Sequence, residues 1–248
     1  MLLERKVAVV YGGGPISAAV AASFARAGAK VFLAGRTAAK LEAIAREISA
    51  RGGVVETVVV DALDQTAVER FVDMVVERAG AIDVSFNLIS VGDVQEPLIE
   101  ISVEDFLQPI VTAMRSHFLT TRAAARHMIA RRSGVILVFG GGGPQTLPGM
   151  GGFKIALDAL EGLRRQWAAE LGPHGIRVVT IKTGGIAETL PDEMPGRDEI
   201  IAGLRKAALL PWTATLNDVG TVAAFLASDQ ARTITAADLN ISAGAIVD

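Results

Sequence analysis

Short apolar runs alternate with longer amphipathic segments along the whole chain. The runs are rich in valine and isoleucine, as strands covered on both faces are, and the segments between them carry apolar residues at helical spacing. In the segment 65–79, for example, Val68, Phe71, Val72 and Val75 fall on one side of a helix. The pattern predicts strands at 7–10, 30–35, 54–60, 82–87, 135–139, 176–181 and 238–241, and helices at 37–50, 65–79, 102–130, 153–171 and 217–227.

Strands that alternate with helices in this way predict an α/β fold with a doubly wound parallel sheet and helices on both faces. No linker or internal repeat divides the 248 residues, so we expect a single domain over residues 1–248. The segment 187–212 includes a polar, proline-bounded stretch, 192–210, which we expect to form a mobile helical insert.

A glycine-rich turn follows the first predicted strand. Gly12, Gly14 and Ser17 occupy the first, third and sixth places of a dinucleotide-binding fingerprint. The first glycine permits a tight turn, the second lets the backbone approach a pyrophosphate, and a small third residue lets the next helix pack closely on the strand. Pro15 suits the first turn of that helix, whose free N–H groups would face the phosphates. A glycine-rich turn in any strand–helix unit is the alternative, but the alternating context favours a Rossmann-like, dinucleotide-binding domain.

The composition of the chain excludes several classes of partner and several kinds of catalytic or metal site. The net charge is −3 and no basic block occurs, so neither nucleic acid nor an anionic membrane is an expected partner. The chain has no cysteine, which excludes disulfides, thiol catalysis and zinc–thiolate sites. Its histidines, His117, His127 and His174, lack metal-ligand spacing, so we expect no metal. No apolar run approaches the ~20 residues of a membrane span. Because the first strand begins close to the N-terminus, we expect no signal peptide and a cytoplasmic protein.

The order of several short segments resembles the short-chain dehydrogenase/reductase family over the whole chain from residue 6. The segments are YGGGPIS after the first strand, GR at 35–36, DALD at 61–64, FNLIS at 86–90, the strand–glycine–helix block 134–171, GPHGIRVVTIKTGGIAET at 172–189 and VGTVAAFLASDQARTIT at 219–235. The resemblance implies an oxidoreductase that binds a nicotinamide dinucleotide at the carboxyl ends of the strands.

The end of the second predicted strand bears on the choice of cofactor. A dinucleotide without a 2′-phosphate usually meets a carboxylate there, which accepts hydrogen bonds from the ribose. This chain has Gly35 and Arg36 instead, with Thr37 beside them. A guanidinium cannot accept those bonds but can hold a 2′-phosphate, so we expect NADP(H) rather than NAD(H). The alternative is that Arg36 only lies on a solvent-facing turn.

By resemblance, Asp61 with Ala62 beside it corresponds to the family's contact with the adenine amino group, and Asn87 to the first asparagine of an Asn-Asn-Ala-Gly segment. Thr183 stands where the family's Pro-Gly-x-Ile segment begins. Lys154 would bind the nicotinamide ribose. The full set of cofactor-binding positions that the resemblance implies is Gly12, Gly14, Ile16, Ser17, Arg36, Thr37, Asp61, Ala62, Asn87, Lys154, Thr183, Gly184 and Ile186.

The resemblance breaks at the catalytic residues. The family uses Asn, Ser, Tyr and Lys, with Tyr and Lys at i and i+4 near the start of a helix. Lys154 matches the lysine, whereas Met150, Gly141 and Ala113 stand at the positions of Tyr, Ser and Asn, with Gly140 at the Ser position if the loop shifts by one. The chain's one tyrosine, Tyr11, lies in the cofactor turn. Loss of a general acid typically costs about 10²–10⁴ in rate, so carbonyl reduction by the family's usual route is not expected.

Other side chains are candidates to replace the missing groups. His117 lies one helical turn beyond Ala113 on the same face and is a speculative catalytic residue, although a lone histidine is more often structural. Gln145 and Thr146 follow the glycine loop and are possible donors to a substrate. Replacing three polar groups also predicts a roomier, more apolar pocket over Gly141, Leu147 and Met150.

These features predict an NADP(H)-binding oxidoreductase with non-standard catalytic machinery, acting on an activated alkene or an unusual carbonyl. The rival hypotheses are a catalytically inactive nucleotide-binding sensor or scaffold of the same fold, and an inactive partner within a hetero-oligomer. The predicted helices 102–130 and 153–171 carry more apolar positions than one sheet face needs, including Phe118, Met128 and Trp167. By resemblance, we expect a homo-oligomer, a dimer or tetramer, that pairs through these helices.

Overall fold

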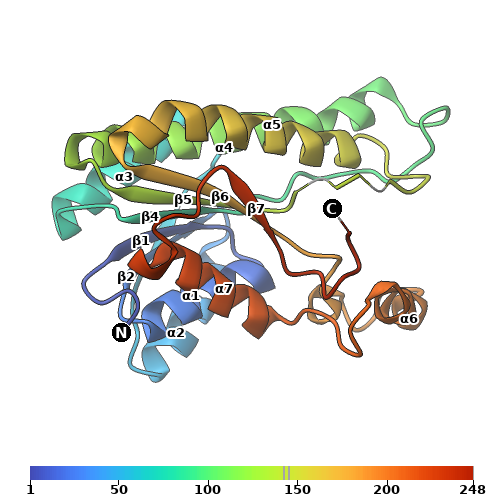
Figure 1. Cartoon of the computed structure of the whole chain (residues 1–248), viewed down its shortest axis with the longest axis horizontal. Coiled ribbons are helices and arrows are strands. Elements are labelled where there is room, and N and C mark those ends of the chain that lie inside the picture. The colour runs from blue at the N-terminus through green and yellow to red at the C-terminus, as the bar shows by residue number, and fades with distance from the viewer. Residues whose placement is uncertain (142, 145, 248) are drawn as a thin grey trace.

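The computed structural model of the chain is a seven-stranded sheet between two layers of helices (Figure 1). The strand order is β3-β2-β1-β4-β5-β6-β7, and each paired neighbour is parallel. The structure describes residues 1–141, 143–144 and 146–247. The strands are β1 (Val7–Tyr11), β2 (Lys30–Gly35), β3 (Val54–Val59), β4 (Val84–Asn87), β5 (Gly134–Phe139), β6 (Ile176–Lys182) and β7 (Ala237–Asn240).

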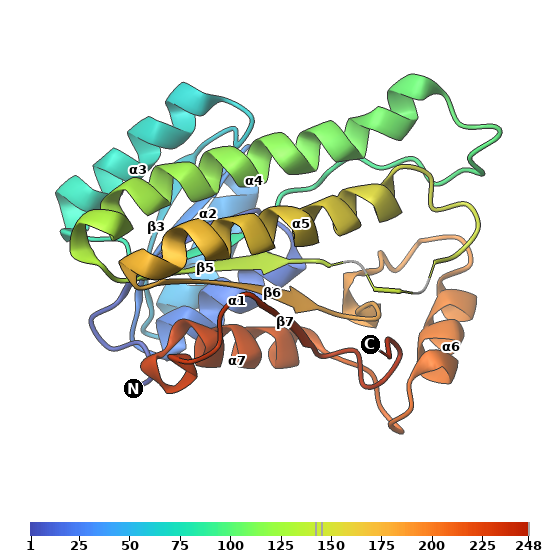
Figure 2. The same ribbon diagram turned by 45° about the horizontal axis from the view of Figure 1, so that its top comes forward.

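Helices α1, α2 and α7 cover one face of the sheet, and α3, α4 and α5 cover the other (Figures 1 and 2). Their bounds are α1 (Pro15–Arg26), α2 (Ala38–Ala50), α3 (Gln65–Ala79), α4 (Val103–Arg131), α5 (Phe153–Leu171), α6 (Arg197–Ala207) and α7 (Leu216–Ala227). The predicted doubly wound α/β fold is confirmed. Within the described part of the chain, none of the helices is both long and apolar enough to span a bilayer.

The strand order places a switch point at β1 and β4. From β1 the chain winds outward through β2 to β3, and then crosses back through α3 to β4 on the other side of β1. Every residue of β1 and β4 is buried, because both strands are covered on both faces. Ligands of open parallel sheets bind outside the carboxyl ends of the strands at such a point.

Strand β3 is the exception to the predicted buried strands. It forms one edge of the sheet, and Val54 and Val59 are 56% and 60% exposed. Glu56 in its middle pairs with Lys30 of β2 at 2.8 Å and with Arg78 of α3 at 3.1 Å. The hydrogen bond from Lys30, together with that from Arg78, holds the pKa of Glu56 below its usual range.

The helix within the expected insert between β6 and α7 is shorter than the predicted 192–210. A single 3-10 turn covers Ala187–Thr189, and the helix within the insert is α6, which has no buried residue and lies beside the main body (Figure 2). Gly196 precedes α6 with a φ of +73°. Residues other than glycine adopt this backbone conformation only at an energetic cost. The mobility of this insert stays a prediction.

Helix α4 buries an unusual number of polar side chains. His117 is 2% exposed, and its Nδ1 has no hydrogen-bond partner in the part of the chain that the structure describes. Burial disfavours the charged imidazolium and lowers the pKa of His117 from 6.5 to about 4. His117 is therefore a neutral core residue at neutral pH.

We predict that His117 makes the fold acid-sensitive. The unfolded chain takes up a proton on this imidazole near pH 6.5, whereas the folded chain takes it up only near pH 4, so stability falls as the pH drops through this interval. The expected loss between pH about 7 and pH about 4.5 is about 2–3 kcal/mol greater in the wild type than in His117→Gln, as measured by urea denaturation. An identical pH dependence in both proteins would contradict the assignment.

Candidate functional site

The glycine turn links β1 to α1 and is packed too tightly for a larger first residue. Gly12 has a φ of +120°, and a Cβ at this position would collide with the Ser17 hydroxyl and lie 2.5 Å from the Leu88 carbonyl oxygen. Ser17 is fully buried, and its hydroxyl donates to the Tyr11 carbonyl at 3.3 Å. The buried side chain of Ser17 therefore packs against the inner side of the turn, next to Gly12. Gly14, by contrast, faces open space, since a Cβ there would meet nothing within 4 Å.

A cleft of about 410 Å³ lies outside the carboxyl ends of β1, β2 and β3, beside this turn. Six predicted cofactor-binding residues line it together: Gly12, Gly14, Arg36, Thr37, Asp61 and Ala62. The volume is within the usual range of ligand pockets. The lining also includes residues that the sequence pattern did not single out, namely Lys40, Leu63, Gln108, Thr112 and the segment 89–92.

The residues of the cleft fit a nicotinamide dinucleotide. The open side of Gly14 leaves room for a pyrophosphate at the N-terminus of α1, where Pro15 occupies the first turn. Arg36 and Lys40 supply two cations at the end of β2, and Asp61 supplies a carboxylate at the end of β3. Lys40 could have been found from the sequence, because it lies one helical turn beyond Arg36 and Thr37 at the start of α2.

The remaining predicted cofactor residues lie outside this cleft lining. Asn87 is fully buried; its amide donates to Thr121 Oγ1 at 3.2 Å, and its carbonyl oxygen accepts from Ser85 Oγ at 3.0 Å. Ile16 of α1 packs against a hydrophobic cluster that includes Val10 and Phe24, and Ile186 belongs to this cluster and is 4% exposed. A Cβ at Gly184 would lie 2.7 Å from Ala245, so the segment 183–184 is packed on the C-terminal segment.

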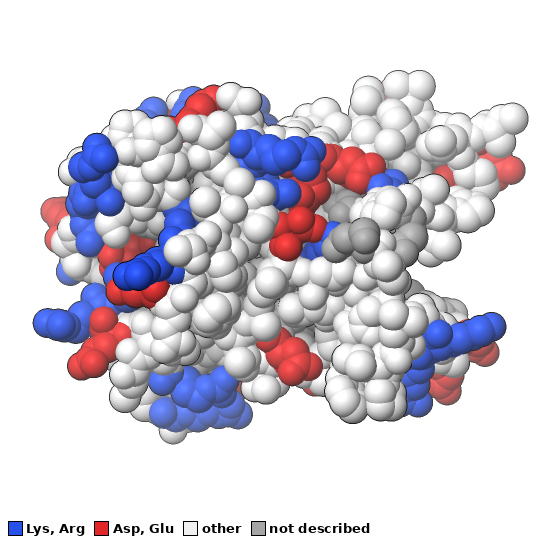
Figure 3. Space-filling view, viewed as in Figure 1, with Lys and Arg blue, Asp and Glu red and all other residues white. Residues whose placement is uncertain are grey.

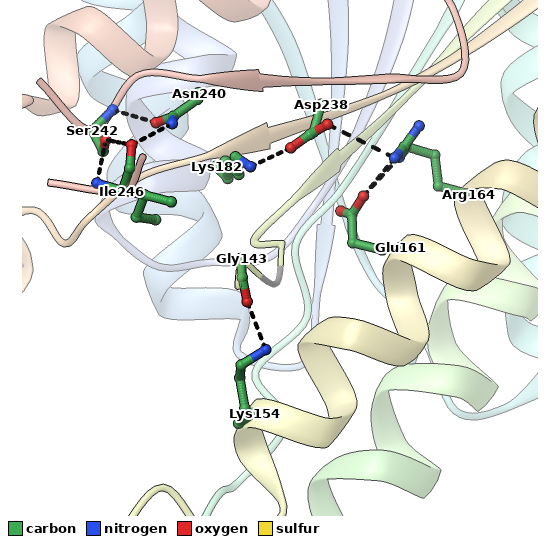
Figure 4. Close-up of polar contacts among 9 residues, drawn as sticks. All are labelled: Gly143, Lys154, Glu161, Arg164, Lys182, Asp238, Asn240, Ser242 and Ile246. Carbon is green, nitrogen blue, oxygen red and sulfur yellow. Dashed lines mark hydrogen bonds and ion pairs between the residues drawn. The ribbon is translucent and has the colours of Figure 1, made fainter. Parts of the chain in front are cut away.

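Lys154 lies in the first turn of α5, 16% exposed in its side chain. Its ammonium donates to the Gly143 carbonyl at 2.9 Å (Figure 4). It also donates to both carboxylate oxygens of Asp158, at 2.6 and 2.7 Å. Lys154 therefore fixes the end of the glycine loop to α5. Met150 precedes the helix, which begins at Phe153. Phe153 is the first residue of α5, and Leu157 lies four residues, about one helical turn, further along.

The predicted apolar pocket over Gly141 is not formed as expected. A Cβ at Gly141 would lie 2.6 Å from Glu161 Oε1 and 3.1 Å from Thr180 Cγ2. The space that a serine side chain would fill at this position is thus taken by a carboxylate from α5. Leu147 is 68% exposed, and Thr146 is exposed as well. Gln145 lies outside the described residues.

Neither helical candidate for the missing asparagine lines the cleft. Ala113 is fully buried in a small cluster with Ala156 and Leu160 of α5, and it belongs to the α4–α5 contact. His117, one turn further along α4, is buried in the interior, as described above. The helical spacing placed both residues on one face of α4 correctly, but that face is covered.

Comparison with known proteins agrees with this geometry. The family model described as enoyl-(acyl carrier protein) reductase matches residues 14–245. Momilactone A synthase of Oryza sativa subsp. japonica is 31% identical over 249 residues, which cover 98% of this chain and 90% of that protein. A-factor type gamma-butyrolactone 1'-reductase (1S-forming) of Streptomyces virginiae is 30% identical over 250 residues, covering 98% of this chain and 96% of that protein.

Solved structures show the same arrangement. Levodione reductase superposes with a TM-score of 0.89 at 26% identity, covering 98% of each chain. The model match, the full-length relatives and the order of the parallel strands lead to one assignment: the chain belongs to the short-chain dehydrogenase/reductase family of oxidoreductases.

Proposed function

We propose that this protein is an NADP(H)-dependent reductase whose substrate does not need a proton from an enzyme tyrosine. The observation that carries the choice of cofactor is Arg36. It lines the cleft at the end of β2, where a carboxylate would serve a cofactor without a 2′-phosphate, and Thr37 and Lys40 lie beside it. A 2′-phosphate bound at the end of β2 would meet the cations of Arg36 and Lys40 and the hydroxyl of Thr37.

The choice of substrate class follows from the missing phenol. We infer that Met150 stands at the family's Tyr position, three residues before α5 begins at Phe153, and that Lys154 keeps the lysine four positions further on. Bound NADPH would supply hydride to the β-carbon of an activated alkene, and the α-carbon would then take one proton, which can come from solvent.

A second candidate function is a nucleotide-binding protein without catalysis. The observation that favours it is the engagement of Lys154, whose ammonium already binds Asp158 and the Gly143 carbonyl. Such a lysine would have to leave a carboxylate at 2.6 Å before it could bind a ribose. In this alternative the cleft keeps its affinity for NADP(H), and the protein acts as a sensor or scaffold.

We further propose that two copies of the chain pair through α4 and α5. Phe118 of α4 stacks on Trp167 of α5 with ring centroids 5.7 Å apart, yet Phe118 remains 41% exposed. Val111 and Ile155 on the same two helices are 58% and 44% exposed. Met128, which the sequence grouped with these residues, is fully buried in the core and takes no part. Exposed apolar side chains on two adjacent helices are typical of an interface when they lie together.

The cofactor proposal predicts that the wild type binds NADPH more tightly than NADH by about tenfold or more, since a hydrogen bond to a charged group is worth about 1.5–3 kcal/mol. Arg36→Glu should reverse this preference, because a carboxylate accepts from a ribose and repels a phosphate. Arg46→Glu makes the same charge change on an exposed position of α2 outside the cleft lining and should leave the preference unchanged. Calorimetric titration with both cofactors measures this. Equal affinities in the wild type would contradict the proposal.

The substrate proposal predicts that NADPH reduces cyclohexenone at its alkene, and that cyclohexanone reacts slower by about 10² or more, in line with the loss of a general acid. Product analysis and NADPH consumption check it. Comparable turnover of the simple ketone would contradict the proposal, whereas tight NADPH binding with no turnover of either compound would establish the second candidate. Met150→Tyr places a phenol four residues before Lys154 and should raise the rate of ketone reduction.

The pairing proposal predicts a dimer or tetramer in light scattering. Phe118→Glu should dissociate it, because a buried interface charge without a partner is costly. Val54→Glu introduces the same charge on the exposed edge strand β3, where Val54 is 56% exposed, and should leave the assembly intact. A monomeric wild type would rule the proposal out.

A further inference from the structure

A groove of about 610 Å³ lies between α1 and α2, on the face of the sheet that α1, α2 and α7 cover. We call it the α1–α2 groove. Its lining comes from the whole length of α1, the second half of α2, the segment 51–54 that follows α2, and both the N-terminal residue and the first residue of α7. It is larger than the cofactor cleft, and the two linings share no residue. The groove is therefore separate from the site described above.

Small side chains on α1 leave this space unfilled. The side of α1 that faces the groove carries alanines at helical spacing, namely Ala18, Ala19, Ala22 and Ala25. Another side of α1 packs closely on α7, because a Cβ on Gly220 would lie 2.8 Å from the Ala19 carbonyl oxygen. Across the groove, α2 contributes Ile44 and Ile48. The long walls of the groove are therefore apolar, and an alkyl chain could lie between them.

The C-terminal ends of α1 and α2 converge at one end of the groove. A Cβ on Gly53 would lie 2.6 Å from Ile48 Cγ2 and 2.9 Å from Ala25 Cβ. Arg26 is the last residue of α1, and Arg51 directly follows the last residue of α2. Both arginines are exposed and line the groove. The groove is therefore apolar along its length and carries two cations at one end.

Neither guanidinium at this end is paired with a carboxylate of the described residues. Arg26 Nη2 donates to the neutral hydroxyl of Ser23 at 3.0 Å, and the side chain of Arg51 forms no hydrogen bond or ion pair with any residue that the structure describes. The lining holds one acidic residue, Glu47, against these two arginines. In the space-filling view, positive side chains gather at the lower edge, where Figure 1 places α2 (Figure 3). The charge at this end of the groove is complementary to a carboxylate.

We propose that the α1–α2 groove binds a medium-chain fatty carboxylate. Its carboxylate lies between Arg26 and Arg51, and its alkyl chain follows the alanines of α1 towards Ile44 and Leu216. Helix α1 is about 16 Å long from Pro15 to Arg26, which is longer than an extended octanoate. An inorganic anion would leave the apolar walls in water, and an uncharged hydrocarbon would leave both guanidiniums without a partner. The site does not depend on the reaction proposed above.

Octanoate, hexanoate and 1-octanol test the proposal in calorimetric titrations of the full chain, at a constant ionic strength set with sodium chloride. Octanoate should bind about tenfold more tightly than hexanoate, because two more methylene groups are buried. It should also bind about tenfold more tightly than 1-octanol, which has the same chain length and no carboxylate. Equal affinities in either comparison, or no saturable binding of octanoate, would overturn the proposal.

Variants at the charged end test the position of the carboxylate. Arg51→Gln should weaken octanoate binding by about fivefold and leave 1-octanol binding unchanged. Glu47→Gln should strengthen octanoate binding, because it removes a nearby negative charge. Arg46→Gln is the matched control, since it removes the same charge from an exposed position of α2 outside the lining, and it should bind octanoate as the wild type does. Equal octanoate affinities of Arg51→Gln and the wild type would refute this placement of the head group.

A variant of the apolar wall tests the position of the alkyl chain. Ala22→Met fills the space between α1 and α2 and should weaken the binding of octanoate and 1-octanol by about tenfold each. Ala50→Met adds the same side chain at an exposed position of α2 outside the lining and should leave both affinities unchanged. Urea denaturation establishes that the variants are folded. Undiminished octanoate binding by folded Ala22→Met would show that the chain lies elsewhere and would overturn the proposal.

Discussion

The contact of Gly12 with the Ser17 hydroxyl and the Leu88 carbonyl is the constraint on which the functional end of the molecule depends. Any side chain at position 12 would push α1 away from β1, or push apart the segments that leave β1 and β4. These segments meet at the switch point of the sheet, and the cleft lies directly outside it. The cleft is thus a consequence of backbone packing, and the side chains of Arg36 and Asp61 complete its lining.

The fold was predictable from the sequence because its signals are local. The apolar runs of β1, β4 and β5 and the spacing in α3 and α5 gave elements that differ from the observed ones by a few residues at most. The cleft lining around Arg36, Thr37 and Asp61 was predictable for the same reason, since the carboxyl ends of parallel strands meet at one edge.

The parts that could not be predicted depend on contacts between distant segments. A Cβ on Gly152 would collide with the Phe106 carbonyl, and this close approach to α4 joins residues far apart in the sequence, which no local pattern reveals. Similarly, the glycine at position 141 predicted an open pocket. The Glu161 carboxylate, from twenty residues further along the chain, occupies the space beside Gly141 instead. Helical periodicity identified a shared face for Ala113 and His117 but not what covers it.

The edge strand β3 has a consequence for the behaviour of the protein at high concentration. Its exposed Val54 and Val59 would invite pairing with a strand from another molecule, because an uncovered edge presents free backbone donors and acceptors. Glu56, held by Lys30 and Arg78, places a paired charge in the middle of that edge. A second strand approaching from outside would have to desolvate this ion pair, which protects the sheet against intermolecular growth and aggregation.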